Sequence, residues 1–264
     1  MGEDTRAGQW SDLSQRLLSG GIAAAIGLWL MWLGGLPFKF LIAIIVGLMV
    51  WEVARMVGAA AFSMAFGALA AVVMVALALV PNGLALPLIF LPALFGIAKL
   101  EEHKVSFSLF STAILVAGLG LFVLREDYGF LWMAWLAFVV IASDVLGYFA
   151  GRIIGGPKFW PKVSPKKTWS GTLAGWAGAA LIGASLAALG HAGVEIVGIS
   201  VAVAIAGQLG DVAESALKRR MGVKDSSSIL PGHGGMFDRF DSMLGASLFL
   251  LVNGPIVGFP PGIS

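Results

Sequence analysis

The chain has 264 residues, of which 58% are hydrophobic and only 12% are charged. Soluble domains contain about 25% charged residues, so this composition, with a mean hydropathy of +0.92, excludes a water-soluble globular protein. The absence of cysteine excludes a disulfide-stapled secreted domain. A net charge of +2 and a pI near 9.0 do not indicate nucleic acid as a partner, because basic residues of membrane proteins commonly mark cytoplasmic loops. We expect an all-α, polytopic integral membrane protein.

Nine apolar segments follow a polar N-terminal tail over residues 1–16, and glycine, proline or charged breakers separate them. A membrane-spanning helix needs about 20 residues. The first apolar segment is too long for a signal peptide and is expected to be a retained helix. The absence of an internal repeat counts against an inverted-repeat transporter. The expected spans are 17–35, 38–57, 59–80, 84–98, 106–124, 128–150, 171–190, 194–217 and 243–259.

Two polar loops set the expected orientation. The loop 151–170 contains five basic residues and no acidic one, namely Arg152, Lys158, Lys162, Lys166 and Lys167. The positive-inside rule makes this loop cytoplasmic. The loop 218–242 follows two spans later and is expected on the same side. Nine spans then place the N-terminus in the cytoplasm and the C-terminus outside, in the periplasm.

Ionisable residues inside the apolar segments are candidates for function, because a charge at bilayer depth costs at least about 2.5–3.5 kcal/mol and usually faces the bundle interior. Glu52 and Arg55 are three residues apart on one helical face, and we expect a structural ion pair there rather than a catalytic role. Asp144 has no basic residue within one turn. Its partner must come from another helix, a metal or a substrate.

The eighth expected span carries a polar face. Asp211, Glu214, Ser215 and Lys218 are spaced i, i+3, i+4 and i+7, so they project from one side of a helix. Lys218 lies about 10 Å along the axis from Asp211 at ~1.5 Å per residue. This separation suits a metal at one end and a phosphate at the other. The alternative is an amphipathic helix end that emerges into water.

Residues 211–241 hold interleaved charges of both signs, and such a mixture fits poorly with simple attraction to anionic lipids. It is typical of phosphate chemistry with a divalent metal, where oxygen ligands bind Mg²⁺ and Lys or Arg neutralise phosphoryl oxygens. Without cysteine and with only three histidines, a thiolate zinc site is excluded and a histidine-rich one is not expected. The charged residues are Asp211, Glu214, Lys218, Arg219, Arg220, Lys224, Asp225, Asp238, Arg239 and Asp241.

A glycine-rich segment, 231–235, interrupts these charges. Its glycines permit positive φ and expose successive N–H groups, which can form an anion-binding nest. His233 can donate to a phosphate or cap the turn, and the residues alone leave both open. Asp238 and Asp241 then share one face where the last helix begins. Two carboxylates so close repel unless a cation lies between them, and a metal is the simplest explanation.

The other loop contains a turn, 164–168, that presents two ammonium groups, Lys166 and Lys167, beside the hydroxyls of Ser164 and Thr168. A lysine pair on a cytoplasmic loop is usually only a topology signal. Here the loop is expected to share a face with the carboxylate loop, which favours a role in phosphate binding.

Together these residues resemble the phosphatidate cytidylyltransferases (CDP-diacylglycerol synthases). The resemblance is specific over about 142–243. One departure is Ser170, where the family commonly has an acidic residue, so no role of that carboxylate carries over. The matching positions are Asp144 to Tyr148, Gly151-Arg152, Ser164 to Trp169, Gly210-Asp211, Glu214-Ser215, Lys218-Arg219, Lys224-Asp225, Leu230 to Gly235, Asp238-Arg239 and Asp241.

The resemblance implies that the enzyme joins CTP and phosphatidic acid in the bilayer, forming CDP-diacylglycerol and releasing pyrophosphate. It further implies a bacterial inner-membrane protein with its site facing the cytoplasm, and a homodimer is a family-level expectation. N-terminal transmembrane helices, 17–127, would precede a catalytic transmembrane region, 128–264. The attacking phosphate monoester, with a second pKa near 6, is already largely dianionic at pH 7 and needs no strong base.

Our hypothesis for the site has Asp211, Asp238 and Asp241 binding Mg²⁺, beside a second cation such as K⁺, with Lys218, Arg219 and Arg239 neutralising phosphate oxygens. Two other functions stay open: a CTP-dependent lipid kinase of the polyprenol type, and an ion-coupled transporter that uses Asp144 and Asp211. The expected substrate-binding residues are Asp144, Ser164, Lys166, Lys167, Thr168, Ser215, Lys224, Asp225, His233, Gly234 and Gly235.

Overall fold

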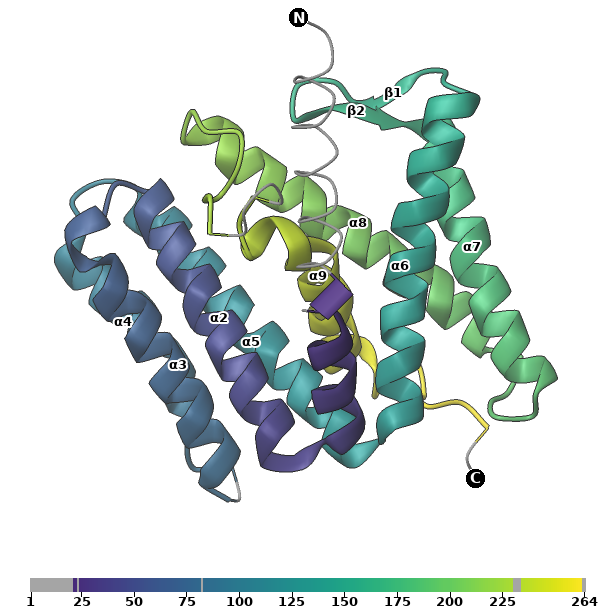
Figure 1. The fold of residues 1–264 in the computed structure, drawn as a ribbon, viewed down its shortest axis with the longest axis horizontal. Helices are drawn as coiled ribbons and strands as arrows, with labels where there is room; N and C mark the ends of the chain where they lie inside the picture. Colours follow the sequence, from purple (N-terminus) through teal and green to yellow (C-terminus); the bar gives the residue numbers. More distant parts are fainter. Residues whose placement is uncertain (1–20, 23, 82, 230–233, 263–264) are drawn as a thin grey trace, which may run out of the picture.

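The computed structural model describes residues 21–22, 24–81, 83–229 and 234–262. The expected tail 1–16 and His233 lie outside these residues. Helices make up most of the fold (Figure 1). After a helix over Ala24–Leu33 they are α2 (Gly35–Met56), η1 (Ala60–Phe62), α3 (Ser63–Leu79), η2 (Leu86–Phe90), α4 (Leu91–Lys99), α5 (Lys104–Asp127), α6 (Phe130–Ile153), α7 (Trp169–Ala188), α8 (Ile196–Arg220) and α9 (Phe237–Asn253).

Among the described residues, six helices are long and apolar enough to cross a membrane. They are Gly35–Met56, Ala60–Leu79, Lys104–Asp127, Phe130–Ile153, Trp169–Ala188 and Ile196–Arg220. Within the described residues the other three expected spans contain only shorter helices, so the count of nine stays a prediction. In the fourth segment, prolines at the first turns of η2 and α4 divide the chain into two short pieces, because proline cannot donate a backbone hydrogen bond. The ninth, α9, has 17 residues.

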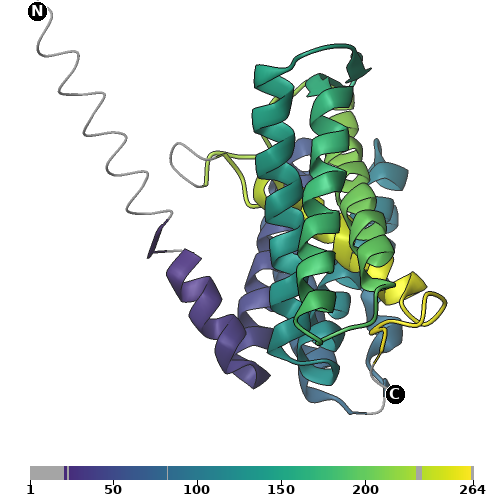
Figure 2. The ribbon, with the colours of Figure 1, turned by 90° about the vertical axis from the view of Figure 1, so that its right-hand side faces the viewer.

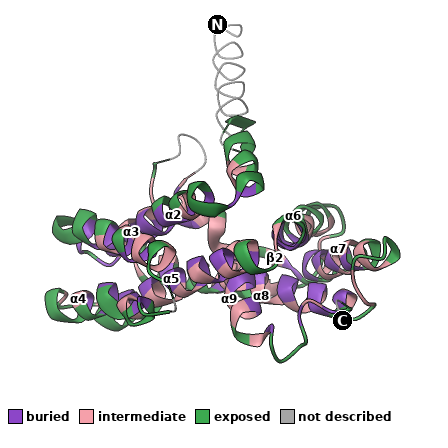
Figure 3. Cartoon of the chain, turned by 90° about the horizontal axis from the view of Figure 1, so that it is seen from below, coloured by how far each residue is buried: buried purple, intermediate pink, exposed green. Residues whose placement is uncertain are grey.

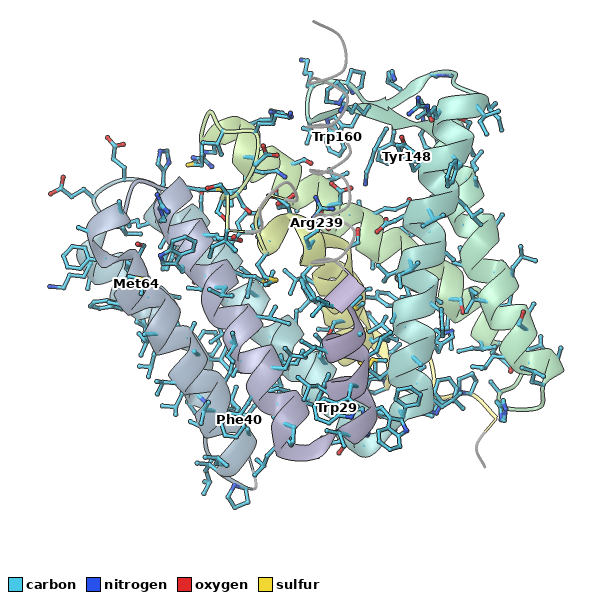
Figure 4. The ribbon with its side chains drawn as sticks, in the orientation of Figure 1. Trp29, Phe40, Met64, Tyr148, Trp160 and Arg239 are labelled. Carbon is cyan, nitrogen blue, oxygen red and sulfur yellow. The ribbon has the colours of Figure 1, made fainter. Side chains whose placement is uncertain are left out.

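The helices form two groups, which Figure 3 shows side by side. α2 to α5 pack against one another, α6 to α9 form the second group, and α9 also packs against α5. The Ala24–Leu33 helix leans away from the rest (Figure 2). Large apolar side chains cover the outer surface, including Trp29, Phe40 and Met64 (Figure 4). A bundle with apolar residues both inside and outside is what a lipid environment requires.

A short β-hairpin was not expected in an all-α chain. β1 (Lys158–Trp160) pairs antiparallel with β2 (Ser164–Thr168) inside the predicted loop 151–170. Gly155 and Gly156 both have positive φ, a conformation that ends α6 and that glycine adopts without steric cost. The ring of Phe159 then packs edge-on against Trp169, with centroids 4.9 Å apart, and fixes the hairpin on the start of α7.

The hairpin and the segment that follows α8 lie at the same end of the molecule (Figure 1). The two polar loops thus lie at one end of the structure, and the side of the membrane that they face stays a prediction.

Candidate active site

A cavity of about 540 Å³ opens between the hairpin and the helices α6, α7, α8 and α9. Seven of the predicted site residues line it: Asp144, Lys166, Lys167, Thr168, Asp211, Asp238 and Asp241. The cavity wall also contains residues that were not in the predicted set, among them Ser143, Thr172, Gln208 and Ser242. The carboxylates and lysines that lie far apart in the sequence therefore meet in one place.

Two glycines allow the carboxylate-bearing helices to approach. A Cβ atom at Gly210 would overlap the carbonyl oxygen of Asp241, and one at Gly245 would overlap that of Ala206. Only glycine permits such close backbone contact. As a result α8 and α9 cross directly beside Asp211 and Asp241, which brings these side chains together.

Lys167 connects the hairpin to α8. Its Nζ lies 2.6 Å from Asp211 Oδ2 in an ion pair and donates to the backbone oxygen of Gln208 at 3.4 Å. The next residue, Thr168, caps α7 by accepting a hydrogen bond from the N–H of Gly171 at 3.2 Å, which is the usual role of threonine at a helix start. Ser170 is the position where the sequence departs from the resembled family. Its hydroxyl donates to the carbonyl oxygen of Gly155 and so links the first turn of α7 to the residues that follow α6.

Three carboxylates form a group that could bind a cation. One oxygen each of Asp211, Glu214 and Asp241 lies within 4.8 Å of the others. Both Glu214 oxygens are buried and make no hydrogen bond, and Oε2 is compensated by an ion pair with Lys218 Nζ at 2.7 Å. Oε1 has no such partner. Burial of an unpartnered carboxylate oxygen is costly, so this donor set fits a hard divalent cation. Glu214 lies on the polar face identified from the sequence but was not among the predicted ligands.

Asp238 has a different environment from the one that the metal hypothesis assumed. Its Oδ1 accepts from Lys218 Nζ at 2.6 Å, and its Oδ2 accepts from the N–H groups of Gly235 at 2.8 Å and Ser226 at 3.0 Å. Burial disfavours its charge, but the hydrogen bonds from Lys218 and Gly235 outweigh it and lower the pKa of Asp238 to about 2. Asp238 thus organises the segment before α9 and is not in the three-carboxylate group.

Part of the glycine-rich segment and the residues after it already donate hydrogen bonds to carboxylates of the protein itself. Gly234 has φ of +86°, as a nest would need. However, the N–H of Gly235 donates to Asp238, and those of Met236 and Phe237 donate to Glu52. These three amides therefore already have acceptors, and phosphate binding at the rest of the motif stays a prediction.

The other predicted residues lie around this centre. Asp144, on α6, is 3.5 Å from the hydroxyl of Ser242 on α9, so its first partner comes from another helix. Ser215 donates to Asp211 Oδ1 at 3.2 Å. Arg219, Lys224, Asp225 and Arg239 are exposed, and Ser164 is half-buried where β2 begins. Figure 4 places Arg239 at the start of α9, below the hairpin that carries Trp160.

The expected ion pair between Glu52 and Arg55 is wrong. Glu52 is fully buried and accepts hydrogen bonds from the segment before α9 and from the first residue of α9, the N–H of Phe237 at 2.7 Å. The Arg55 guanidinium instead lies over the ring of Trp51, 4.9 Å from its centroid, in a cation–π contact. Spacing on one helical face could not reveal partners that are 174 or more residues away.

Comparison with known proteins agrees with this geometry. A family model described as the cytidylyltransferase family matches residues 14–253. The chain is 36% identical to the phosphatidate cytidylyltransferase of Brucella abortus (strain 2308), over 96% of this chain and 97% of that protein. It is 33% identical to the enzyme of the same name from Bacillus subtilis (strain 168), over 90% and 96%. The Helicobacter pylori (strain 26695) enzyme is 36% identical over 64% and 65%. The chain therefore belongs to the cytidylyltransferase family.

Proposed function

We propose that this protein is a phosphatidate cytidylyltransferase that converts CTP and phosphatidic acid into CDP-diacylglycerol and pyrophosphate. The observation that carries the proposal is the ion pair between Lys167 and Asp211, which joins a basic hairpin to a carboxylate-bearing helix across one cavity. The names of the relatives and the family membership point to the same reaction.

The chemistry requires two polyanions to meet. A non-bridging oxygen of the lipid phosphate attacks the α-phosphorus of CTP, and the bond from that phosphorus to the β-phosphate bridging oxygen breaks. The electron pair leaves with pyrophosphate. Because the attacking phosphate is already largely dianionic at pH 7, catalysis consists mainly of positioning and charge neutralisation. Lys166 and Lys167 line the cavity and would hold phosphoryl oxygens from the hairpin side.

A divalent cation fits the carboxylates that face this cavity. We propose Asp211, Glu214 and Asp241 as the residues that would bind Mg²⁺, because one oxygen of each converges with the others and Glu214 Oε1 is buried without a hydrogen bond or an ion pair. Asp238, a ligand in the sequence hypothesis, would instead orient Lys218. When bound, Mg²⁺ would neutralise the charge of the CTP phosphates. A second cation such as K⁺ stays part of the proposal.

The wider setting is also proposed. The excess of Lys and Arg in the hairpin loop supports a site that faces the cytoplasm, in a bacterial inner membrane with nine spans. The cavity adjoins apolar helices, so acyl chains would reach it sideways from the bilayer. The homodimer expected from the resemblance stays a prediction, which light scattering of the detergent-solubilised protein can test.

The deciding experiment gives the purified protein phosphatidic acid, Mg²⁺ and CTP labelled at the α-phosphorus. Cytidylyl transfer puts the label in the lipid. In a parallel reaction with a polyprenol in place of phosphatidic acid, a lipid kinase would transfer the γ-phosphoryl group to the lipid hydroxyl and leave the label in free CDP. Absence of any metal-dependent CTP consumption would instead revive the transporter interpretation.

A further inference from the structure

Glu52 is a fully buried carboxylate that lies outside the cavity. Both of its oxygens are used. Oε1 accepts hydrogen bonds from the hydroxyl of Ser227 at 2.5 Å and the N–H of Met236 at 2.8 Å. Oε2 accepts from the N–H of Phe237 at 2.7 Å, with the hydroxyl of Ser226 at 3.2 Å. A buried carboxylate requires such partners, and here every one comes from the connection between α8 and α9 or from Phe237, the first residue of α9.

Two of these donors are the first N–H groups of α9. The N-terminal N–H groups of a helix have no partner within the helix and favour a negative charge. Met236, the residue before α9, supplies no side-chain cap. Glu52 supplies it from α2, a helix of the other group.

A short series of contacts runs from Glu52 to the site. The hydroxyl of Ser226 lies 3.2 Å from Glu52 Oε2 and 3.0 Å from Asp238 Oδ2. Asp238 in turn accepts from Lys218. A Cβ atom at Gly235 would overlap both Ser226 Oγ and Glu52 Oε1, so the packing around this carboxylate leaves no room for another side chain. Only one side chain separates Glu52 from Asp238.

We propose that Glu52 is a positioning residue for the reaction of the preceding section, on which this inference rests. By capping α9 and holding Ser226, it sets Asp238 and Asp241 relative to α8. It reaches the reacting groups only through these residues. A purely structural carboxylate would affect the stability of the fold alone, whereas a positioning residue also changes how the site uses its divalent cation.

Glu52→Gln provides the direct test. Glutamine keeps the volume but turns an NH₂ group toward N–H donors. We expect turnover to fall by about 10–100-fold, as for residues that support metal ligands, and the Mg²⁺ concentration for half-maximal activity to rise. Trypsin should also cut faster at Lys224, which is exposed in the segment that Glu52 holds. Glu52→Asp keeps the charge and should recover part of the lost turnover.

Glu126→Gln is the matched control. Glu126 also caps a helix from another element, since it accepts from the N–H of Gly35 at the start of α2 at 2.9 Å and pairs with Lys39 at 3.4 Å. Glu126, on α5, is more exposed than Glu52 and contacts the end of α2 opposite to the one that carries Glu52. Activity and Mg²⁺ dependence of this variant should stay within about two-fold, as for changes outside a buried network.

If Glu52→Gln does not fold, Ser227→Ala carries the test, because it removes one donor to Glu52 and should shift the Mg²⁺ dependence and the cleavage rate in the same direction by less. The positioning role is overturned if Glu52→Gln, or Ser227→Ala in its place, matches the Glu126 control in turnover, Mg²⁺ dependence and cleavage at Lys224. If the wild-type protein puts no label into lipid, the proposed function fails instead, and the cleavage rate still reports whether Glu52 holds the segment.

Discussion

The two helix groups, α2–α5 and α6–α9, differ in how many charged side chains they enclose and in what those side chains contact. In the α2–α5 group the interior is made of apolar side chains such as Phe66, Phe107 and Met49, with Glu52 as its fully buried carboxylate. In the α6–α9 group, carboxylates and lysines face a cavity. The difference supports the proposal that the first group serves as a scaffold and the second holds the reacting groups, with Glu52 as a contact between them.

The largest effect is expected from Asp211→Asn, which removes a proposed metal ligand and the partner of Lys167. Turnover with CTP and phosphatidic acid should fall by more than about 100-fold, beyond the loss typical of residues behind the ligands. The amount of protein in the membrane should not change. Asp127→Asn, an exposed change in the scaffold group, is the control. Near-normal turnover of the Asp211 variant would remove this residue from the metal site.

The next comparison separates two ligand sets. Glu214→Gln should raise the Mg²⁺ concentration for half-maximal activity by about 10-fold or more, because it removes a member of the converging group. Asp238→Asn should lower turnover with a smaller change in that concentration, since Asp238 contacts Lys218. Titration of activity with Mg²⁺ measures both. The opposite ranking would restore the set of Asp211, Asp238 and Asp241.

A smaller loss is expected at the hairpin. Lys167→Ala removes the ion pair with Asp211 and one positive charge from the cavity, and turnover should fall by about 10-fold or more, with weaker CTP binding. Lys162→Ala, exposed on the same hairpin loop, should leave turnover unchanged in a steady-state assay. Equal losses in the two variants would mean that the hairpin acts through its overall charge.

The smallest effects concern packing. Gly245→Ala and Gly47→Ala each place a methyl group against a backbone oxygen of a neighbouring helix, α8 and α3 respectively. Both should destabilise the fold by about 1–3 kcal/mol, measured as a lower Tm in detergent. Of the two, only Gly245→Ala should also raise the Mg²⁺ concentration for half-maximal activity, because it pushes α8 away from α9. If Gly47→Ala also raised the Mg²⁺ concentration for half-maximal activity, packing in the α2–α5 group would affect the site as well as the fold.

Residue spacing and loop charge predicted the features that depend only on neighbours in the sequence. The spacing of Asp211, Glu214 and Lys218 placed them on one helical face, and the positive loop with its lysine pair was expected beside the carboxylates, where Lys167 contacts Asp211. Ser226 and Glu52 could not be paired in this way, since their contact spans 174 residues and depends on how α2 packs near α9. The hairpin was missed because a charged loop with three prolines carries little strand signal. The shortness of η2 and α4 follows from their prolines, whose effect on length the hydropathy pattern does not show.

The hydrogen bonds to Glu52 also have a consequence for the order of assembly. The four donors to Glu52 follow α8 in the chain, so Glu52 has none of them while α2 to α8 are synthesised. An unpartnered carboxylate is costly to bury, so the carboxylate on α2 can be buried only when α9 packs beside it. The site is then completed only after α9 is made, and a chain that stops before α9 would neither bury Glu52 nor bring Asp241 to Asp211 and Glu214.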